Sequence, residues 1–226
     1  MECLIITGCT SGLGLELHRN LALEADERYC CICLGRDLKR LEKNPAFIYL
    51  ETDFTKEYVG KFLLNSLPEN LTRVTIISNA GVVSPIVQVE HLPINAFADA
   101  VKVNFTTPVA LVSSLALWTK QNQVLLRVLN VSSGAANRAI QGWATYCATK
   151  VGFKMFLDVL SAEQPLTEVI HFDPGVMDTA MQKEIRESSL DRMPDIDIFT
   201  EYKKNNRLIS PKDVAIQLLK VLRADA

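Results

Sequence analysis

The residues best suited to chemistry are a tyrosine and a lysine four positions apart, Tyr146 and Lys150. On a helix this spacing places both side chains on the same face. A free phenol has a pKa of about 10 and gives up its proton poorly at neutral pH. A nearby ammonium group favours the phenolate and lowers that pKa, so the pair is suited to exchanging a proton with a substrate oxygen. Ser133, upstream of the pair, can orient the same oxygen by a hydrogen bond.

A second chemistry-bearing segment is the glycine-rich stretch 7–14, which reads Thr-Gly-Cys-Thr-Ser-Gly-Leu-Gly. Glycines permit a tight turn and a close approach of the backbone to a pyrophosphate, and the helix N-terminus that follows offers unpaired N–H groups to the phosphates. Glycines also serve as ordinary turn residues, but the position of this loop between a predicted strand and a predicted helix favours dinucleotide binding. The loop residues expected to contact the cofactor are Gly8, Thr10, Ser11, Gly12, Leu13 and Gly14.

The end of the second predicted strand indicates which dinucleotide binds. An acidic side chain there would bind the 2′-hydroxyl of the adenosine ribose, but this position is taken by Gly35, which Arg36 follows. A guanidinium group can pair with a 2′-phosphate, so the sequence favours NADP(H) over NAD(H). The alternative is that Arg36 is a surface residue at the start of a helix.

The elements that must position these residues are short apolar runs that alternate with longer helical patterns. Strands are predicted at Cys3–Ile6, Tyr29–Leu34, Phe47–Leu50, Val74–Ser78, Val124–Val131 and Val169–Phe172. The alternation predicts a single-domain, Rossmann-like α/β fold over residues 1–226, with a doubly wound parallel sheet and helices on both faces. In such a fold the ligand crevice lies at the carboxyl ends of the strands, where the glycine loop, Asn79-Ala80-Gly81 and Ser133 are all expected.

The composition excludes several other classes of protein. The chain has 226 residues, of which 48% are hydrophobic, and its net charge of −2 gives no basic excess for binding nucleic acid. No apolar run approaches the ~20 residues that a membrane span needs, and the N-terminus lacks the basic start of a secretory signal. We therefore expect a cytoplasmic protein without a nucleic-acid or membrane partner.

The cysteines and histidines do not predict a metal site. Cys30, Cys31 and Cys33 lie in a predicted strand, where neighbouring side chains point to opposite faces, and their spacing is not C-x-x-C. We interpret them as reduced structural thiols in a core. The three histidines are scattered, and none belongs to a motif. No metal is expected.

Taken together, the glycine loop, Asn79-Ala80-Gly81, Ser133 and the Tyr146–Lys150 pair resemble the short-chain dehydrogenase/reductase family. The resemblance covers the chain to about Ala224. It implies that Asn104 holds a water in a proton relay and that Ser133, Tyr146 and Lys150 are the other catalytic residues. Ser11 departs from the basic residue that many NADP-preferring members carry there.

The resemblance also implies a set of cofactor contacts outside the glycine loop. Asp53 matches the acid that contacts adenine, and Asn79-Ala80-Gly81 matches the motif that steadies the sheet beside the cofactor. Tyr146 and Lys150 are also expected to contact the cofactor, Lys150 by reaching the nicotinamide ribose hydroxyls. The segment that grips the nicotinamide carboxamide corresponds to Pro174, Gly175, Val176 and Thr179.

Three segments narrow the resemblance. Residues 131–136, 142–147 and 174–182 are similar to the sepiapterin reductase subgroup, and within it most similar to bacterial benzil reductases. This implies reduction of a bulky or aromatic α-dicarbonyl to a hydroxyketone. We expect the family's last strand to be missing, because Pro211–Leu222 reads as the final helix and the sequence stops at Ala226, although a truncated or alternatively ended chain is the other explanation. That absence argues against a pterin substrate.

The polar, irregular segment from Thr179 to Ser210 is expected to form a lid over the substrate. Alternatively, its apolar residues pack a helix on the body of the protein. Trp143 could floor an aromatic pocket or could be an ordinary packing residue. The residues expected to contact the substrate are Ser133, Trp143, Tyr146, Met177 and Met181.

The sequence thus predicts NADPH-dependent reduction of a carbonyl, with Tyr146 as the proton donor. One alternative is an NADP(H)-binding sensor without significant turnover, and another is alcohol oxidation in the reverse direction. A homodimer is expected by family analogy, through the apolar faces of 103–117 and 153–160, although those faces could instead pack against the sheet.

Overall fold

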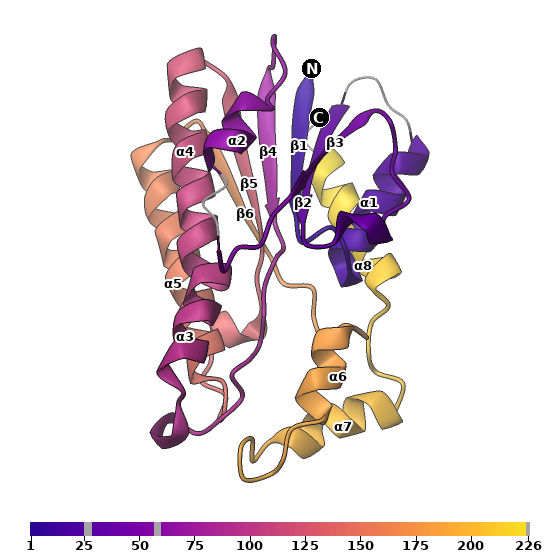
Figure 1. Cartoon of the computed structure of the whole chain (residues 1–226), viewed down its shortest axis with the longest axis vertical. Coiled ribbons are helices and arrows are strands. Elements are labelled where there is room, and N and C mark those ends of the chain that lie inside the picture. Colours follow the sequence, from indigo (N-terminus) through magenta and orange to yellow (C-terminus); the bar gives the residue numbers. More distant parts are fainter. Residues whose placement is uncertain (25–28, 57–59, 225–226) are drawn as a thin grey trace.

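The computed structural model describes residues 1–24, 29–56 and 60–224. Within them, every predicted strand is present in one parallel sheet of order β3-β2-β1-β4-β5-β6 (Figure 1). The strands are β1 (Glu2–Thr7), β2 (Tyr29–Gly35), β3 (Phe47–Glu51), β4 (Arg73–Ser78), β5 (Leu125–Val131) and β6 (Thr167–Phe172). The order reverses direction between β1 and β4, which is the point where a doubly wound sheet opens its ligand crevice.

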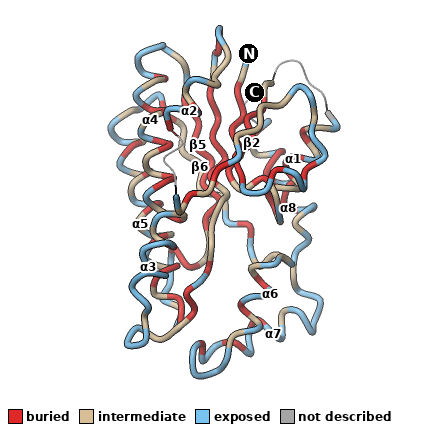
Figure 2. Tube along the Cα trace, viewed as in Figure 1, coloured by how far each residue is buried: buried red, intermediate tan, exposed pale blue. Residues whose placement is uncertain are grey.

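Helices cover both faces of the sheet because alternate strand residues point to opposite sides. From β1, Cys3 and Ile5 pack under α2 (Gly60–Asn65), α4 (Thr107–Asn122) and α5 (Ala144–Glu163). From the same strand, Leu4 and Ile6 pack under α1 (Gly12–Glu24) and α8 (Pro211–Arg223). Figure 2 shows that the buried residues concentrate along the strands and the helix faces turned toward them. The predicted fold class is confirmed.

A long helical stretch runs past the sheet as α3 (Ile94–Val101), a π-helical segment η3 (Lys102–Thr106) and α4. It spans 29 residues with a mean hydropathy of 1.4 in its most apolar window, so by length and composition alone it is able to cross a membrane. The sequence prediction missed this because Asp99 and Lys102 interrupt the apolar run. Half of that window is buried, and Leu111 and Leu115 of α4 belong to the sheet core. Buried core helices pass the same test, so the stretch is weak evidence for a membrane.

Residues 179–210, the segment that the sequence predicts as a lid and that is called the lid below, are largely helical where the sequence suggested irregular structure. It contains α6 (Ala180–Arg186) and α7 (Ile196–Lys204), which lie beyond the carboxyl ends of the strands (Figure 1). Thr179 caps α6 by accepting a hydrogen bond from the Gln182 N–H. At the base of the lid, the Asp178 N–H donates to the Ile209 carbonyl at 2.9 Å. The lid therefore leaves and rejoins the body at neighbouring residues.

The last described helix, α8, is capped by Ser210 and fixed to the sheet by a buried arginine. Arg127 of β5 is 1% exposed; it donates from Nη1 to the Leu222 carbonyl at 2.8 Å and from Nε to the Glu168 carboxylate. After α8 the described chain forms no further strand through residue 224. Three single-turn 3₁₀ helices complete the described elements: η1 (Leu38–Arg40), η2 (Val89–His91) and η4 (Gly134–Ala136).

Candidate active site

The carboxyl ends of the central strands bring the predicted site segments together. The glycine loop follows β1, Asn79 to Gly81 follow β4, and Ser133 follows β5. Pro174 and Gly175 follow β6 and lead into the lid. All four segments lie at one edge of the sheet, with α6 and α7 beyond them (Figure 1).

The glycine loop is held against the end of β4 by a compact set of hydrogen bonds. Thr7 Oγ1 accepts from the Asn79 N–H at 2.9 Å and from the Ala80 N–H at 3.0 Å. The Asn79 amide donates back to the Thr7 carbonyl at 2.9 Å. A Cβ at Gly14 would lie 2.2 Å from the Gly8 carbonyl oxygen, so only glycine lets α1 start this close to β1. Asn79 and Ala80 thus fix the loop's shape.

The start of α1 fits the pyrophosphate of a dinucleotide. The first N–H groups of any α-helix have no intrahelical acceptor, and they point toward the carboxyl edge of the sheet here. The Leu13 side chain is buried, so this residue offers only its backbone. Gly12 has a positive φ of 52°, and a Cβ there would lie 3.4 Å from the Thr179 side chain. Gly12 and Thr179 therefore face each other across a narrow gap that a larger residue would fill.

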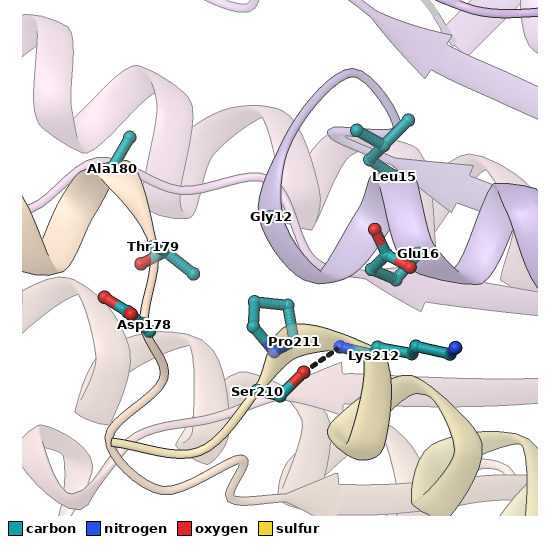
Figure 3. A pocket seen from close by; sticks show the side chains of 9 residues that line it. All are labelled: Gly12, Leu15, Glu16, Asp178, Thr179, Ala180, Ser210, Pro211 and Lys212. Atoms are coloured by element: carbon teal, nitrogen blue, oxygen red, sulfur yellow. Dashed lines mark hydrogen bonds between the residues drawn. The ribbon is translucent and has the colours of Figure 1, made fainter. Parts of the chain in front are cut away.

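A cavity of about 320 Å³ opens beside that gap (Figure 3). It lies between the start of α1, the start of the lid and the start of α8. Its lining residues are Gly12, Leu15, Glu16, Asp178, Thr179, Ala180, Ser210, Pro211 and Lys212. Tyr146 does not line it, because apolar residues of the lid pack over the phenol.

Arg36 and Asp53 follow the neighbouring strands β2 and β3. Hydrogen bonds from Thr55 are the main reason that the pKa of Asp53 is lowered. Arg36 is exposed at the end of β2, and its positive charge lowers the pKa of Asp53 further. A Cβ at Gly35 would lie 3.0 Å from the Thr10 side chain and 3.1 Å from the Cys9 sulfur. An acidic side chain does not fit at this position without a shift of those neighbours.

The structure brings Ser133, Tyr146 and Lys150 together. Lys150 Nζ lies 5.7 Å from the centroid of the Tyr146 ring and donates to the Val131 carbonyl at 2.9 Å. Ser133 caps η4, where its hydroxyl accepts from the Ala135 N–H at 3.2 Å. The helix and the strand end therefore aim a hydroxyl, a phenol and an ammonium at one place.

The electrostatics of this trio differ from the sequence prediction. Burial raises the pKa of Tyr146 to about 12, a hydrogen bond from Ser133 lowers it, and the charge of Asp173 raises it further. Burial lowers the pKa of Lys150 to about 8, against the raising effect of Asp173. The net shift of the Tyr146 pKa is therefore upward, opposite to the lowering expected from the ammonium and an oxidised nicotinamide, because burial is its largest cause.

Asp173 is a site residue that the sequence reasoning missed. It follows β6, and its carboxylate accepts from the Gly175 N–H at 3.0 Å. The second carboxylate oxygen lies 4.0 Å from where a Cβ of Gly134 would be. The only signal in the sequence was an acid directly before Pro174-Gly175, at the end of a predicted strand.

Asn104 occupies the π-helical segment η3 and is 4% exposed. Its side chain accepts from the Val82 N–H at 2.8 Å and donates to the Val82 carbonyl at 2.8 Å. It also donates to the Thr149 hydroxyl at 3.3 Å. The residue thus ties the loop after β4 to α5, and π-helical turns of this kind are frequent at functional sites.

Trp143 lies between Tyr146 and the lid. Its ring centroid is 5.5 Å from that of Tyr146, at 82°, and 5.2 Å from that of Phe199 in α7. Met181 packs against the same cluster. Met177 does not: it packs with the core beneath α1 and α8, because the lid base pairs it with Ile209. The structure therefore does not support Met177 as a substrate contact.

The family model for short chain dehydrogenase matches residues 2–190 of this chain. The chain belongs to the short-chain dehydrogenase/reductase family. Residues 2–190 include the glycine loop, the Ser133–Tyr146–Lys150 trio and the start of the lid. The protein is accordingly an oxidoreductase that uses a nicotinamide cofactor and acts on a small molecule.

Individual members of the family resemble this chain over nearly its full length. A benzil reductase ((S)-benzoin forming) of Bacillus cereus is 31% identical over 247 positions, which cover 100% of this chain and 95% of the relative. A sepiapterin reductase of Bos taurus is 31% identical, covering 98% of this chain and 89% of the relative. A solved short-chain dehydrogenase/reductase structure from Saccharomyces cerevisiae is 26% identical, with a TM-score of 0.83, covering 94% and 86% of the two chains. The subgroup resemblance seen in the sequence is confirmed.

Proposed function

We propose that this short-chain dehydrogenase/reductase is an NADPH-dependent carbonyl reductase. The observation that carries the proposal is the trio at the carboxyl edge of the sheet. A buried phenol, Tyr146, lies beside the Ser133 hydroxyl and within 5.7 Å of the Lys150 ammonium. That edge is also where the glycine loop opens. The arrangement supplies hydrogen-bond donors at the place where a ketone oxygen gains negative charge.

The nicotinamide cofactor would supply the hydride that adds to the carbonyl carbon. The first turn of α1 would hold its pyrophosphate, Thr179 and Val176 its carboxamide, and Asp53 its adenine. Arg36 would pair with a 2′-phosphate, which is the basis for proposing NADPH rather than NADH. The tight packing of Gly35 against Thr10 and Cys9 is consistent with this choice, because an acid at that position would force those neighbours to shift.

The chain's own residues would handle the proton. Ser133 and Tyr146 would hydrogen-bond the substrate oxygen, and the raised pKa of Tyr146 keeps the phenol protonated until it donates. The proton moves from the phenol to the oxygen of the new alcohol, and Lys150 and Asn104 would lead a replacement proton to Tyr146. Because the Asn104 side chain already bonds Val82 and Thr149, we assign a relay water to its backbone.

We propose a bulky or aromatic α-dicarbonyl as the substrate. The named activity of the bacterial relatives supports this, as does the apolar character of the residues around the phenol. Trp143 and the lid residue Met181 would contact the substrate, and the lid would open to admit it because it now packs on Tyr146.

The test is NADPH oxidation with benzil, followed by absorbance, for the wild type and for Tyr146→Phe. We expect the variant to lose at least about 100-fold in kcat while its NADPH affinity stays within about twofold. Undiminished turnover by the variant would refute the role of the phenol. Tight NADPH binding with no turnover of benzil or of a panel of other carbonyls would favour a sensor instead. Benzoin oxidation with NADP⁺ measures the reverse direction.

We also propose a cytoplasmic homodimer without nucleic-acid or membrane partners. The outer faces of α4 and α5 carry exposed apolar side chains that a second copy would cover. These are Leu117, Val151, Met155 and Val159. Light scattering of the purified protein measures the oligomeric state.

A further inference from the structure

The Trp143 side chain is 5% exposed, yet its indole N–H is buried without a hydrogen-bond partner among the residues that the structure describes. Tyr and Trp polar groups usually find a partner when they are buried, because an unpaired donor loses its hydration without compensation. The indole nitrogen is a donor only, so an acceptor is what this position lacks. An unpaired donor inside a site indicates a group that arrives from outside the chain.

Among the described residues no acceptor lies within hydrogen-bond distance of the Trp143 indole N–H, and the cluster that holds the ring is hydrophobic. Its cluster is formed by apolar side chains from the body and the lid, together with Tyr146. The buried members besides Trp143 and Tyr146 are Val83, Ile86, Ala135, Ile185, Met193, Ile196 and Phe199. Phe199 lies over the indole at 5.2 Å and 35°, and it has no polar atom. The lid therefore closes an apolar surface over a polar group.

Trp143 also lies directly beside the reacting centre. It precedes Tyr146 by three residues at the start of α5, and the two rings meet edge to face with centroids 5.5 Å apart. We therefore expect a molecule whose carbonyl oxygen binds the Tyr146 hydroxyl to extend next to the indole. An oxygen on the carbon adjacent to the reacting carbonyl lies about 3 to 4 Å from the first oxygen, which is the scale of one hydrogen-bonded contact.

We propose that the indole N–H of Trp143 donates a hydrogen bond to the second oxygen of a vicinal dicarbonyl. This inference rests on the proposed function and adds the means by which the site selects its substrate class. Ser133 and Tyr146 bind the oxygen that is reduced, and Trp143 binds the neighbouring oxygen, which stays a carbonyl. A simple ketone would leave the indole unpaired, and sites built to hydrogen-bond a substrate group discriminate against analogues that lack it.

The experiment compares benzil with deoxybenzoin, a ketone of similar shape that lacks the second oxygen. For the wild type with saturating NADPH, we expect kcat/KM to be higher for benzil. Trp143→Phe removes the donor and keeps an aromatic ring, so we expect kcat/KM for benzil to fall about 10- to 100-fold and that for deoxybenzoin to change by less than about threefold. Phe199→Leu is the matched control: it disturbs the same ring contact without removing a donor, and should change both substrates by one common factor.

The outcomes separate this inference from the proposed function. Two results would refute the role of the indole and leave the proposed reductase function intact. One is equal kcat/KM of the wild type for both ketones, and the other is a change in kcat/KM by the same factor for both ketones in Trp143→Phe. If the wild type reduces no carbonyl, the proposed function falls and this inference falls with it.

A second measurement needs no variant, in case Trp143→Phe folds poorly. The chain contains two tryptophans, so in ¹⁵N-labelled wild-type protein the indole of Trp118 is an internal reference. With NADP⁺ bound, addition of benzoin should shift the Trp143 indole proton downfield, as a new hydrogen bond requires, and leave that of Trp118 in place. A Trp143 resonance that does not move on benzoin binding overturns the inference.

Discussion

Lys150 and Val131 are joined by a hydrogen bond of 2.9 Å from the ammonium to the main-chain carbonyl at the end of β5. The bond links α5 to the strand that leads directly into Ser133. The phenol, the ammonium and the serine hydroxyl are therefore held by one contact between a helix and a strand end. Its consequences are measurable, because the lysine is charged and partly buried.

We expect Lys150→Met to lose at least about 100-fold in kcat and to be more stable than the wild type at pH 7. Burial lowers the pKa of Lys150 in the folded protein from 10.5 to about 8. The unfolded chain thus binds this proton more tightly, and wild-type stability rises with pH between about 8 and 10.5. Below that window the full penalty of the buried charge is present, so methionine should add roughly 1–3 kcal/mol at pH 7. Thermal unfolding at pH 7 and pH 10 measures the gain, and a gain that does not shrink at the higher pH would contradict this explanation.

We expect Asp173→Asn to move the alkaline limb of the kcat/KM profile to lower pH. The charge of Asp173 raises the pKa of both Tyr146 and Lys150, and the wild-type limb should lie near the Lys150 pKa of about 8. Asparagine removes the charge and keeps an oxygen that can accept from the Gly175 N–H. Asp178→Asn, which removes a carboxylate paired with Lys203 in the lid, is the control and should leave the limb in place. A shift of the alkaline limb to higher pH in Asp173→Asn would contradict the expectation that the Asp173 charge raises these two pKa values.

We expect Arg36→Ala to raise the KM for NADPH by about 10- to 100-fold and to change kcat/KM for NADH by less than about twofold. The reason is that only NADPH carries the 2′-phosphate that the guanidinium would bind. Arg40→Ala is a matched control, because the Arg40 guanidinium is already paired with Asp37 at 2.5 Å on the same exposed surface. Equal effects of Arg36→Ala on the two cofactors would remove the basis for NADP selectivity.

We expect Arg127→Ala to lower the free energy of unfolding by about 2–3 kcal/mol without changing kcat or KM. The change leaves the Leu222 carbonyl and the Glu168 carboxylate without the buried guanidinium, at the end of β5 away from the site. Arg73→Ala, which breaks a partly exposed pair with Glu2 at 3.7 Å, should lower it by less than about 1 kcal/mol. Urea unfolding measures both variants. A similar decrease in the free energy of unfolding for Arg127→Ala and Arg73→Ala would contradict the larger stabilising role of Arg127.

The sheet was predictable because the hydrophobicity of each strand matches its burial in the sheet. Runs such as Val74–Ser78 are buried on both faces, so they are apolar throughout, and the turns between them carry glycine or polar residues. The position of Tyr146, Lys150 and Ser133 at one edge then follows from the geometry of parallel strands. Site segments that follow strands directly are therefore readable from sequence.

Features set by the lid were not predictable. The direction of the Tyr146 pKa shift depends on burial beneath α6 and α7, which no local pattern encodes. Met177 appeared to belong with the substrate by its place in the chain, but the pairing of the lid base turns it toward the α1–α8 core. Asp173 acts through space on Tyr146 and Lys150, and only the fold brings the three together.

The pairing of Met177 with Ile209 has a further consequence for how such enzymes diversify. This backbone pairing holds the two ends of the lid side by side. The residues between the two ends can therefore be lengthened, shortened or exchanged while the separation of the ends stays fixed. The part of the lid between Asp178 and Ile209 could then be replaced by the matching segment of another reductase and keep the same two attachment points. A change in substrate range would therefore require replacement of the lid alone, while the sheet and the glycine loop stay unchanged.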